Sequence, residues 1–403
     1  MKELQKVGIF CKEYPPHVYG GAGVHVEHLA RALSDHVAVE VRCFGDQRIE
    51  GGSLTVRGFP QWEETKRGTD PRFVGAVDAV ARSLVMAKER FDGEIVHCHT
   101  WYADFAALLA GKLWDVPSVL TIHSLEPLRP WKVEQLGNAY HLSRWIEKTA
   151  IEQVDAVIAV SEETKADVLR LFEVDPDRVH VIHNGIDLEI YRPVEAIDAL
   201  TRHGIDPDRP FVLFVGRIAR QKGILHLLDA IPSLDPSLQV VLCAGAPDTP
   251  EIAHEMREKV ETVRRARDGV IWIEEMLPRD QVIQLYTRAA VFCCPSVYEP
   301  FGIINLEAMA CGTAVVATAV GGIKEVVVPR ETGVLVDPDL REGTFEPRDP
   351  VRFAADLAAA IDRVATDPGL QRRFGEAGRA RAEAHFGWPA IAAKTIELYR
   401  SLL

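Results

Sequence analysis

The 403-residue sequence lacks the features of membrane-spanning, disulfide-linked and nucleic-acid-binding proteins. No apolar run approaches the ~20 residues that cross a bilayer, and no signal core follows the first residues, so we expect a cytoplasmic protein without a membrane partner. The seven cysteines form no Cys-x-x-Cys pair, which indicates reduced, buried thiols. Lys and Arg number 46 against 59 Asp and Glu, and this net charge of −13 argues against nucleic acid or an anionic membrane as the main partner.

The sequence also lacks a convincing metal site. Asp-Pro-Asp occurs three times and resembles the Asp-x-Asp pattern that holds a divalent ion in many enzymes. The central prolines instead predict turns, because each triplet lies in a connecting stretch. His97, His99 and His123 do not have the spacing of zinc ligands, and no helical His-x-x-x-His pair accompanies them. We therefore expect neither a metal nor another cofactor.

What the sequence does contain is a series of short β-branched runs that alternate with longer helical patterns. This alternation is typical of parallel α/β sheets with helices on both faces. In the first half we expect strands at 7–11, 37–44, 95–98, 118–123, 156–160 and 179–183. In the second half we expect them at 211–215, 239–244, 270–273, 291–294, 314–318 and 333–336. Each half then supplies about six strands, which is enough for one doubly wound, Rossmann-like domain.

Turn-forming residues divide the chain into two domains. Pro and Gly interrupt regular structure in the segment 187–208, so we expect an N-terminal domain over 1–190 and a C-terminal domain over 205–386. The final helical stretch, 387–403, is expected to cross back to the N-terminal domain. Two such sheets imply a cleft between them, with ligands at the carboxyl ends of the strands.

Glycines follow the first expected strand. Gly20 and Gly21 precede a helical pattern at 24–33, where small residues let the backbone approach a ligand and the helix start favours a phosphate. The segment is neither a usual Gly-x-Gly-x-x-Gly turn nor a P-loop. Taken alone, it is equally typical of a flexible turn.

Two cations follow the first strand of the second half. Arg217 leaves that strand, and Lys222 lies at the start of the next helix, beside glycines. Because one long cation can fork onto oxygens while the other acts as a point charge, the pair suits a diphosphate. The alternative is a solvated turn.

The most specific stretch is 295–312, which makes a Pro/Gly turn after an apolar strand and then enters a helix. Glu299 and Glu307 are eight residues apart, which on a helix is on the order of 12 Å. This exceeds the ~5–9.5 Å of paired-carboxylate glycosidases. We therefore expect the two glutamates to contact different ends of one extended ligand. The Gly302 amide and the helix start at Ile303 would face its phosphates, whereas solvated helix-face glutamates are the alternative.

Together these segments resemble the GT-B glycosyltransferases of family 4, over essentially the whole chain. The E-x7-E motif of that family stands here as Glu299 to Glu307, and its phosphate-binding pair as Arg217 and Lys222. Two segments are also similar to the short actinobacterial-type glycogen synthases and the related maltose-1-phosphate synthases. They are Tyr-Pro-Pro-x-x-Tyr-Gly-Gly-Ala-Gly at 14–23 and Ser-Leu-Glu-Pro-Leu-Arg-Pro-Trp-Lys at 124–132.

The resemblance implies transfer of glucose with retention, usually from ADP-glucose, to an α-glucan end or to glucose 1-phosphate. It implies that the donor is held by Gly20, Gly21, Asn184, Gly302, Ile303 and Glu307, with Glu307 on the ribose. The catalytic residues that it implies are His123 at the transferred sugar, Glu299 on sugar hydroxyls, and Arg217 and Lys222 on the leaving diphosphate. No side chain stands out as a nucleophile, which suits the same-face mechanism of the family.

The acceptor side is expected near the loop that follows His123. Trp131 would stack on a glucose face, and Arg129 or Lys132 would pair with an anion, so the loop favours a phosphorylated small acceptor. Asp104 is a further candidate. Alternatively, Trp131 only packs a surface loop.

Other functions remain open on the sequence alone. One is a family-4 hexosyltransferase with a lipid or another small acceptor, and a second is a nucleotide-sugar 2-epimerase on the same fold. A third is a non-catalytic sugar-nucleotide sensor. The residues also leave open ADP, UDP or GDP as the donor base, and a monomer or a homodimer.

Overall fold

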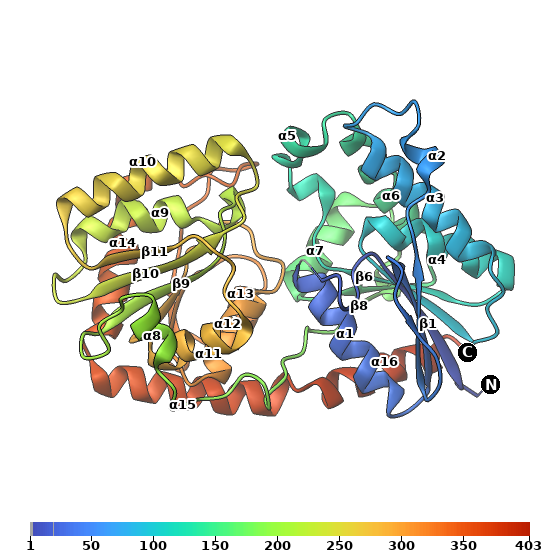
Figure 1. Ribbon diagram of the computed structural model, residues 1–403. Coiled ribbons are helices and arrows are strands. Elements are labelled where there is room, and N and C mark those ends of the chain that lie inside the picture. The colour runs from blue at the N-terminus through green and yellow to red at the C-terminus, as the bar shows by residue number, and fades with distance from the viewer. Residues whose placement is uncertain (1–2, 19) are drawn as a thin grey trace. The chain divides into compact units, whose positions relative to one another are not determined.

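The structure, a computed structural model, describes residues 3–18 and 20–403. The chain forms two compact units, of which the first comprises Met1–Gly185 with Trp388–Leu403 and the second comprises Ile186–Gly387. Each unit is a sheet with helices on both faces, and the strands are parallel except for β3 at the edge of the first sheet (Figure 1). The α/β prediction of two Rossmann-like domains is confirmed.

The strands and helices of the first unit follow one another in chain order. They are β1 (Lys6–Cys11), α1 (Gly21–Ser34), β2 (Ala38–Phe44), β3 (Arg48–Ile49), β4 (Leu54–Phe59), α2 (Glu63–Lys66), α3 (Val74–Lys88), β5 (Ile95–His99), α4 (Trp101–Trp114), β6 (Ser118–Ile122), η1 (Glu126–Leu128), α5 (Lys132–Leu136), α6 (Ala139–Gln153), β7 (Ala156–Ala159), α7 (Glu162–Leu171), η2 (Pro176–Arg178), β8 (Val179–Val181) and, at the end of the chain, α16 (Trp388–Ser401).

The first sheet has the strand order β3-β4-β2-β1-β5-β6-β7-β8 among the described residues. Side chains alternate between its faces, because successive residues of a strand point to opposite sides. In β5, Val96 and Cys98 enter the core formed with α3, α4 and α6. Ile95 enters the opposite core, formed with α1 and α16. His97 and His99 therefore share the face that α1 and α16 cover.

The second unit has its own series of elements. They are α8 (Asp198–Arg202), β9 (Phe211–Arg217), η3 (Arg220–Lys222), α9 (Ile224–Ala230), η4 (Ile231–Ser233), β10 (Gln239–Gly245), α10 (Pro250–Ala266), β11 (Val270–Ile273), α11 (Arg279–Arg288), β12 (Val291–Cys294), α12 (Ile303–Ala310), β13 (Val315–Thr318), α13 (Ile323–Val326), β14 (Gly333–Val336), α14 (Pro350–Ala365) and α15 (Pro368–His385).

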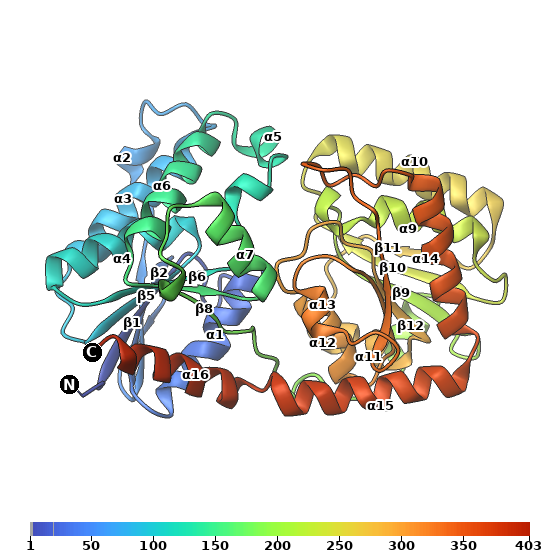
Figure 2. The same cartoon turned by 180° about the vertical axis from the view of Figure 1, so that it is seen from behind.

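The second sheet has the order β11-β10-β9-β12-β13-β14. Val212 of β9, Met256 of α10 and Leu357 of α14 belong to one buried core, so α9, α10 and α14 cover one face. Tyr286 of α11 contacts the ring of Phe292 on the other face. α14 and α15 follow the sheet as the last helices of this unit (Figure 2).

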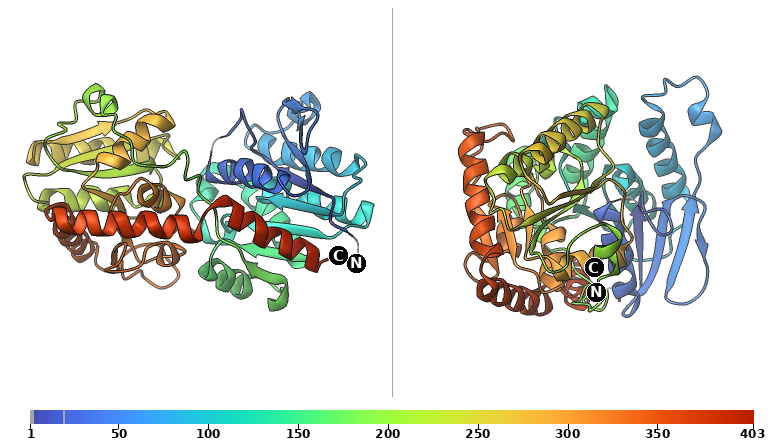
Figure 3. Two further views of the ribbon diagram at one scale, coloured as in Figure 1. Left: turned by 90° about the horizontal axis from the view of Figure 1, so that it is seen from below. Right: turned by 60° about the vertical axis from the view of Figure 1, so that its left-hand side comes forward.

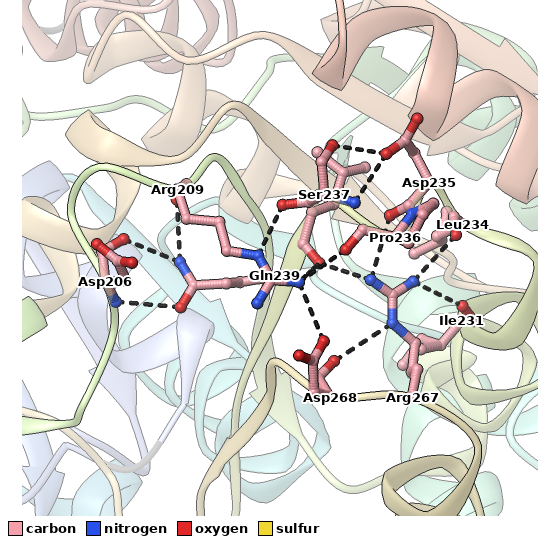
Figure 4. A network of polar contacts seen from close by, with 11 residues as sticks. Asp206, Arg209, Ile231, Leu234, Asp235, Pro236, Ser237, Gln239, Arg267 and Asp268 are labelled. Carbon is pink, nitrogen blue, oxygen red and sulfur yellow. Dashed lines mark hydrogen bonds and ion pairs between the residues drawn. The ribbon is translucent and has the colours of Figure 1, made fainter.

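Two half-buried arginines hold the turn between η4 and β10 (Figure 4). Arg267 donates to carbonyl oxygens of Ile231, Leu234, Asp235 and Leu238. Arg209 donates to those of Pro236, Ser237 and Leu238 and pairs with Asp268. The two guanidinium groups thereby fix the backbone of the turn that precedes β10.

The structure differs from the sequence predictions in the first unit. Its sheet has eight strands rather than about six, because β3 and β4 were not predicted. The segment 48–59 is rich in polar residues and glycine, and β3 pairs antiparallel at the edge of the sheet, so it lacks the apolar character of a buried parallel strand. All six strands predicted for the second half are present.

The junction between the units lies at Gly185 and Ile186, a few residues before the predicted limit of 190. The Ile186 amide donates to the carbonyl of Phe386, and Arg379 donates to the carbonyl of Tyr191, so the chain enters the second unit directly after Gly185. The final helix, α16, packs beside α1 in the first unit (Figure 3).

No helix of the described residues is both long and apolar enough to span a bilayer. All seven cysteines are buried and unpaired. Burial raises the pKa of Cys311 and, still more clearly, that of Cys98, so both are held as thiols.

Candidate active site

In the second unit, the strand order reverses between β9 and β12, and the loops after these two neighbouring strands carry the predicted charged residues. Such a switch point is where open α/β sheets bind ligands. Lys222, in η3 after β9, donates through Nζ to Oε2 of Glu299 at 2.6 Å. Ser296 also donates to this oxygen, at 3.3 Å. The structure therefore brings Lys222 and Glu299 together as an ion pair that is largely shielded from solvent.

Glycines allow the neighbouring turns to approach this pair closely. Gly223 has φ +63°, and a Cβ there would lie 1.9 Å from the carbonyl oxygen of Pro295. Gly321 has φ +52°, and a Cβ there would lie 1.9 Å from the carbonyl oxygen of Glu299. Only glycine fits either position. The turns after β9, β12 and β13 consequently converge on Glu299.

Arg217, the last residue of β9, has a partner that the sequence analysis missed. Its Nη1 donates to Oδ1 of Asp248, which follows β10. The amide of Asp248 in turn donates to the carbonyl of Ile218 at 3.0 Å. Asp248 lies 31 residues from Arg217 and belongs to no recognisable motif, so only the adjacency of β9 and β10 reveals it.

The helix α12 begins at the predicted turn. Gly302 precedes it with φ +96°, and its carbonyl accepts hydrogen bonds from both the amide and the side chain of Asn305. A Cβ on Gly302 would lie 2.8 Å from Nδ2 of Asn305, which explains the glycine. Ile303 is the first helical residue, so the positive end of the α12 dipole lies at the predicted phosphate position.

Glu307 has surroundings different from those of Glu299. Its Oε2 accepts a hydrogen bond from the hydroxyl of Tyr286 at 3.0 Å. Burial raises the pKa of Glu307, while hydrogen bonds from Tyr191 and Tyr286 oppose the shift. The two glutamates of the motif thus have separate partners within this unit.

In the first unit, the strand order reverses between β1 and β5. The glycine turn after β1 leads into α1, and the Gly20 amide donates to Oε2 of Glu13 at 2.8 Å. A Cβ on Gly21 would meet nothing within 4 Å, so the space beside it is open. The Gly20 amide was predicted to bind the phosphates of the sugar nucleotide. In this structure it is hydrogen-bonded to the carboxylate of Glu13 instead.

His123 lies directly after β6 and joins a cluster of imidazoles. Its Nε2 is 3.0 Å from Nδ1 of His99, the last residue of β5. The His25 ring, from α1, packs edge-on against His123 with ring centroids 4.7 Å apart. His97 belongs to a separate set of contacts, since its Nδ1 is 2.6 Å from the Tyr399 hydroxyl and its Nε2 is 2.7 Å from Oγ1 of Thr121.

Burial keeps the imidazoles neutral. It lowers the pKa of His123 to about 4 and that of His97 to about 3. It also lowers the pKa values of His25 and His99 far below the usual value, and the neighbouring histidines add to these shifts. Charging one ring would therefore cost free energy both in lost hydration and in repulsion from the others.

The ligand atoms of His25, His99 and His123 lie within 4.8 Å of one another. Each neutral imidazole offers one nitrogen to a metal ion, and the sequence analysis considered His97 in place of His25. His25 comes from a helix 74 residues before His99, so sequence spacing gave no signal for it.

Asn184 and Trp388 close the cluster on the side of α16. Asn184 is buried, and its Oδ1 has no hydrogen-bond partner among the described residues. Trp388 stacks on His28 with ring centroids 5.6 Å apart and also contacts His25. A Cβ on Gly185 would lie 2.5 Å from the Trp388 ring, so this glycine permits α16 to dock.

The loop after His123 surrounds a buried carboxylate that the sequence analysis did not single out. Glu126 is 1% exposed, and its Oε1 lies 3.6 Å from Nη1 of Arg129 and 3.4 Å from Nζ of Lys132. Arg129 also donates to Oγ of Ser124 at 3.0 Å. Trp131 lies between the two cations in sequence and is partly exposed.

A third cation belongs to this surface. Lys12 lies over the ring of Tyr102, 3.9 Å from its centroid. Burial lowers the pKa of Lys132, and repulsion from Arg129 and Lys12 adds to the shift, whereas Glu126 opposes it. We call Lys12, Arg129 and Lys132 the cation cluster.

Asp104 does not reach solvent. It is 1% exposed in α4, and burial raises its pKa to about 7. The prediction that Asp104 contacts an acceptor therefore requires a correction, because in this structure its carboxyl lies in the interior near Cys98 and Glu126.

Comparisons with known proteins identify the family. The sequence profile described as Glycosyltransferase Family 4 matches residues 19–190, and the profile described as Glycosyl transferases group 1 matches residues 198–381. The α-maltose-1-phosphate synthase of Mycolicibacterium smegmatis is 47% identical over 401 residues, covering 98% of this chain and 99% of that relative. The chain belongs to the family-4 glycosyltransferases. The resemblance and the assignment as an enzyme are thereby confirmed.

Further relatives agree with this family-4 assignment. The α-maltose-1-phosphate synthase of Mycobacterium tuberculosis (strain CDC 1551 / Oshkosh) is 46% identical over 98% of this chain and 99% of its own length. Among solved structures, sucrose-phosphate synthase from Thermosynechococcus elongatus superimposes with a TM-score of 0.76 at 26% identity, covering 99% of both chains. The two-domain GT-B fold is therefore that of this glycosyltransferase.

Proposed function

We propose that this glycosyltransferase moves glucose from ADP-glucose to glucose 1-phosphate, with retention, and forms an α-1,4 link. The bond from glucose C1 to the diphosphate breaks, a bond from C1 to the acceptor O4 forms, and the acceptor proton leaves with ADP. The names of the two relatives that are 46% and 47% identical support this product.

The observation that carries the choice of acceptor is the cation cluster. Arg129 and Lys132 both lie beside the buried carboxylate of Glu126, and Lys12 is near enough to lower the pKa of Lys132, so three cations gather at this loop. A phosphate group would accept hydrogen bonds from the guanidinium and pair with the ammonium groups. A neutral glucan end has no such charge to offer.

The donor roles follow from the ion pairs of the second unit. Lys222 and Arg217 would stabilise the negative charge that develops on the leaving diphosphate. As Lys222 turns to the diphosphate, Glu299 would accept a hydrogen bond from a sugar hydroxyl instead. His123 would contact the transferred glucose, and Glu307 the ribose.

A second candidate acceptor is the end of an α-glucan. The partly exposed Trp131 favours it, because an aromatic ring stacks on a sugar face without requiring charge. The two acceptors are distinguished by whether the cation cluster matters.

The test offers ADP-, UDP- and GDP-glucose with either glucose 1-phosphate or glycogen and identifies the product by mass and its anomeric configuration by NMR. We expect a disaccharide phosphate in the α configuration. Arg129→Gln and Lys132→Gln should raise the KM for glucose 1-phosphate about tenfold without changing that for glycogen. Lys148→Gln is the matched control, because Lys148 forms an exposed ion pair with Glu152 on α6. Equal effects of the Arg129 and Lys132 variants on both acceptors would contradict the proposal.

A further inference from the structure

The contact between His99 and His123 constrains the protons of both rings. Nδ1 of His99 and Nε2 of His123 are 3.0 Å apart, which is a hydrogen-bond distance. Each ring is neutral and so carries one N–H and one bare nitrogen. One of the two facing nitrogens must therefore carry the shared proton.

The surroundings of Nε2, the other nitrogen of His99, indicate which of the two facing nitrogens carries the shared proton. Nε2 of His99 is buried and has no hydrogen-bond partner among the described residues. Buried N–H groups without a partner are rarer in proteins than acceptors without one. The His99 proton is consequently placed on Nδ1, where it is satisfied, rather than on Nε2, where it would not be.

We propose that His99 is a positioning residue whose Nδ1–H donates to Nε2 of His123 and thereby places the proton of His123 on Nδ1. His123 then presents a hydrogen-bond donor, and not a base, to the transferred sugar. The inference rests on the proposed function only in the role given to His123. A donor at this point would stabilise negative charge on a sugar oxygen without removing a proton from the acceptor.

Two further observations show how His99 is held in place. The next residue, Thr100, has φ +69°, a region that β-branched residues rarely adopt and that costs of order 1–3 kcal/mol. His97, two residues before His99, is hydrogen-bonded to Tyr399 and Thr121. The His97 ring lies 4.3 Å from that of His99, measured between ring centroids. The backbone on one side and a tethered ring on the other thus restrict the orientation of His99.

A metal ion shared by His25, His99 and His123 is the competing explanation of this cluster. Metal-bound histidines almost always donate their second N–H to a carboxylate, a carbonyl or a water. Nε2 of His99 has no carboxylate or carbonyl partner among the described residues. The charged groups that shift the pKa values of His25 and His99 are other histidines and not carboxylates. The direct hydrogen bond therefore fits the surroundings better.

The experiment compares His99→Asn with His99→Leu in the full chain. The Asn amide can place an N–H where Nδ1 lies, whereas Leu has a similar size and no donor. We expect His99→Leu to lower kcat about tenfold with the donor KM within about threefold, and His99→Asn to recover most of this loss. Equal thermal unfolding temperatures of the two variants would separate the effect from general destabilisation.

The direct readout is the ¹⁵N NMR spectrum of histidine-labelled protein, with the His123 resonances assigned by their loss in His123→Gln. We expect His123 to be protonated at Nδ1 in the unsubstituted protein and in His99→Asn, and to become a mixture of tautomers in His99→Leu. His254→Gln is the control, because His254 is exposed on α10 of the second unit, so the His123 resonances should stay unchanged.

Three results would overturn the inference. They are a proton on Nε2 of His123 in the unsubstituted protein, an unchanged His123 spectrum in His99→Leu, and one equivalent of bound zinc in metal analysis of the purified protein. A changed tautomer with unchanged kcat would instead support the positioning of His123 by His99 and would overturn the proposed role of His123 at the sugar.

Discussion

The two units hold their candidate catalytic residues in opposite electrostatic settings. In the second unit, Lys222 pairs with Glu299 and Arg217 pairs with Asp248, so each cation already faces a carboxylate. In the first unit, His123 faces the neutral rings of His25 and His99. We therefore expect the ion pairs of the second unit to exchange one anion for another, and the imidazoles of the first unit to contact uncharged hydroxyl groups.

This difference has a physical cost on each side. Partly buried ion pairs must break to receive a phosphate, but their cations remain charged throughout. Neutral imidazoles need no counter-ion, but they must be kept from taking up protons by burial. The following predictions test these two settings, from the largest expected effect to the smallest.

Replacing Trp388 should have the largest effect, because Trp388 covers His25 and His28 and fills the space beside Gly185. We expect Trp388→Ala to lower the stability of the first unit by about 3–5 kcal/mol. Hydrogen exchange resolved by peptide, with increasing urea, follows each unit separately. Trp145→Ala is the control, since Trp145 is 55% exposed and should matter little. Equal loss of hydrogen-exchange protection in both units would contradict the prediction that Trp388 stabilises the first unit in particular.

Removing the charged groups of the second unit should act on activity. We expect Lys222→Ala, Arg217→Ala and Glu299→Gln each to lower kcat at least ~100-fold, the scale of losing a group that stabilises charge in a transition state. Lys259→Ala is the matched control, because Lys259 pairs with Asp229 elsewhere in the same unit. Steady-state kinetics on folded variants give the answer. Near-normal turnover in any two of the three would refute the assigned site.

Acid should destabilise the first unit through its neutral histidines. The pKa of His123 is lowered to about 4, so the unfolded chain binds a proton near pH 6.5 while the folded chain does not. The contribution of His123 to the free energy of unfolding is therefore fully present above pH 6.5. It is lost as the pH falls from 6.5 towards 4, by about 1.4 kcal/mol per pH unit for this one histidine. Urea titrations at pH 7.5, 6.5 and 5.5 measure it.

Two variants calibrate this pH dependence. His123→Asn should reduce the slope between pH 6.5 and 5.5, because one group that titrates differently in the two states is gone. His254→Gln should leave it unchanged, since His254 is largely exposed. A slope that His123→Asn does not alter would show that the ring is not held neutral.

The smallest expected effect is that of a chelator. Since Arg217 and Lys222 supply positive charge for the diphosphate, we expect turnover to stay within about twofold after EDTA treatment. Assays before and after dialysis against EDTA measure this. If activity is lost after EDTA treatment and restored by magnesium or manganese, a metal ion helps Arg217 and Lys222 to neutralise the diphosphate.

The sequence predicts the second unit better than the first, for a physical reason. Buried parallel strands such as β9 and β12 read as continuous apolar runs, and turn residues mark their ends. The short edge strand β3 and its partner β4 carry polar side chains, because one side of an edge is open to solvent. These two strands were therefore missed.

The candidate site divides in the same way. Arg217, Lys222, Glu299 and Glu307 lie within local motifs, and the structure places them around neighbouring loops of one sheet. Asp248 and His25 have no motif of their own, because their positions depend on strand adjacency and helix packing. The catalytic roles of these residues stay predictions.

The position of α16 has a consequence for the synthesis of the protein. Tyr399, which contacts His97, and Trp388, which covers His25, are translated after the whole second unit. A ribosome-bound chain that ends before residue 388 would hold the first sheet with one core covered by α1 but lacking α16. The first unit to be translated is thus the last to be completed, and folding of the nascent chain should finish only after its last helix leaves the ribosome.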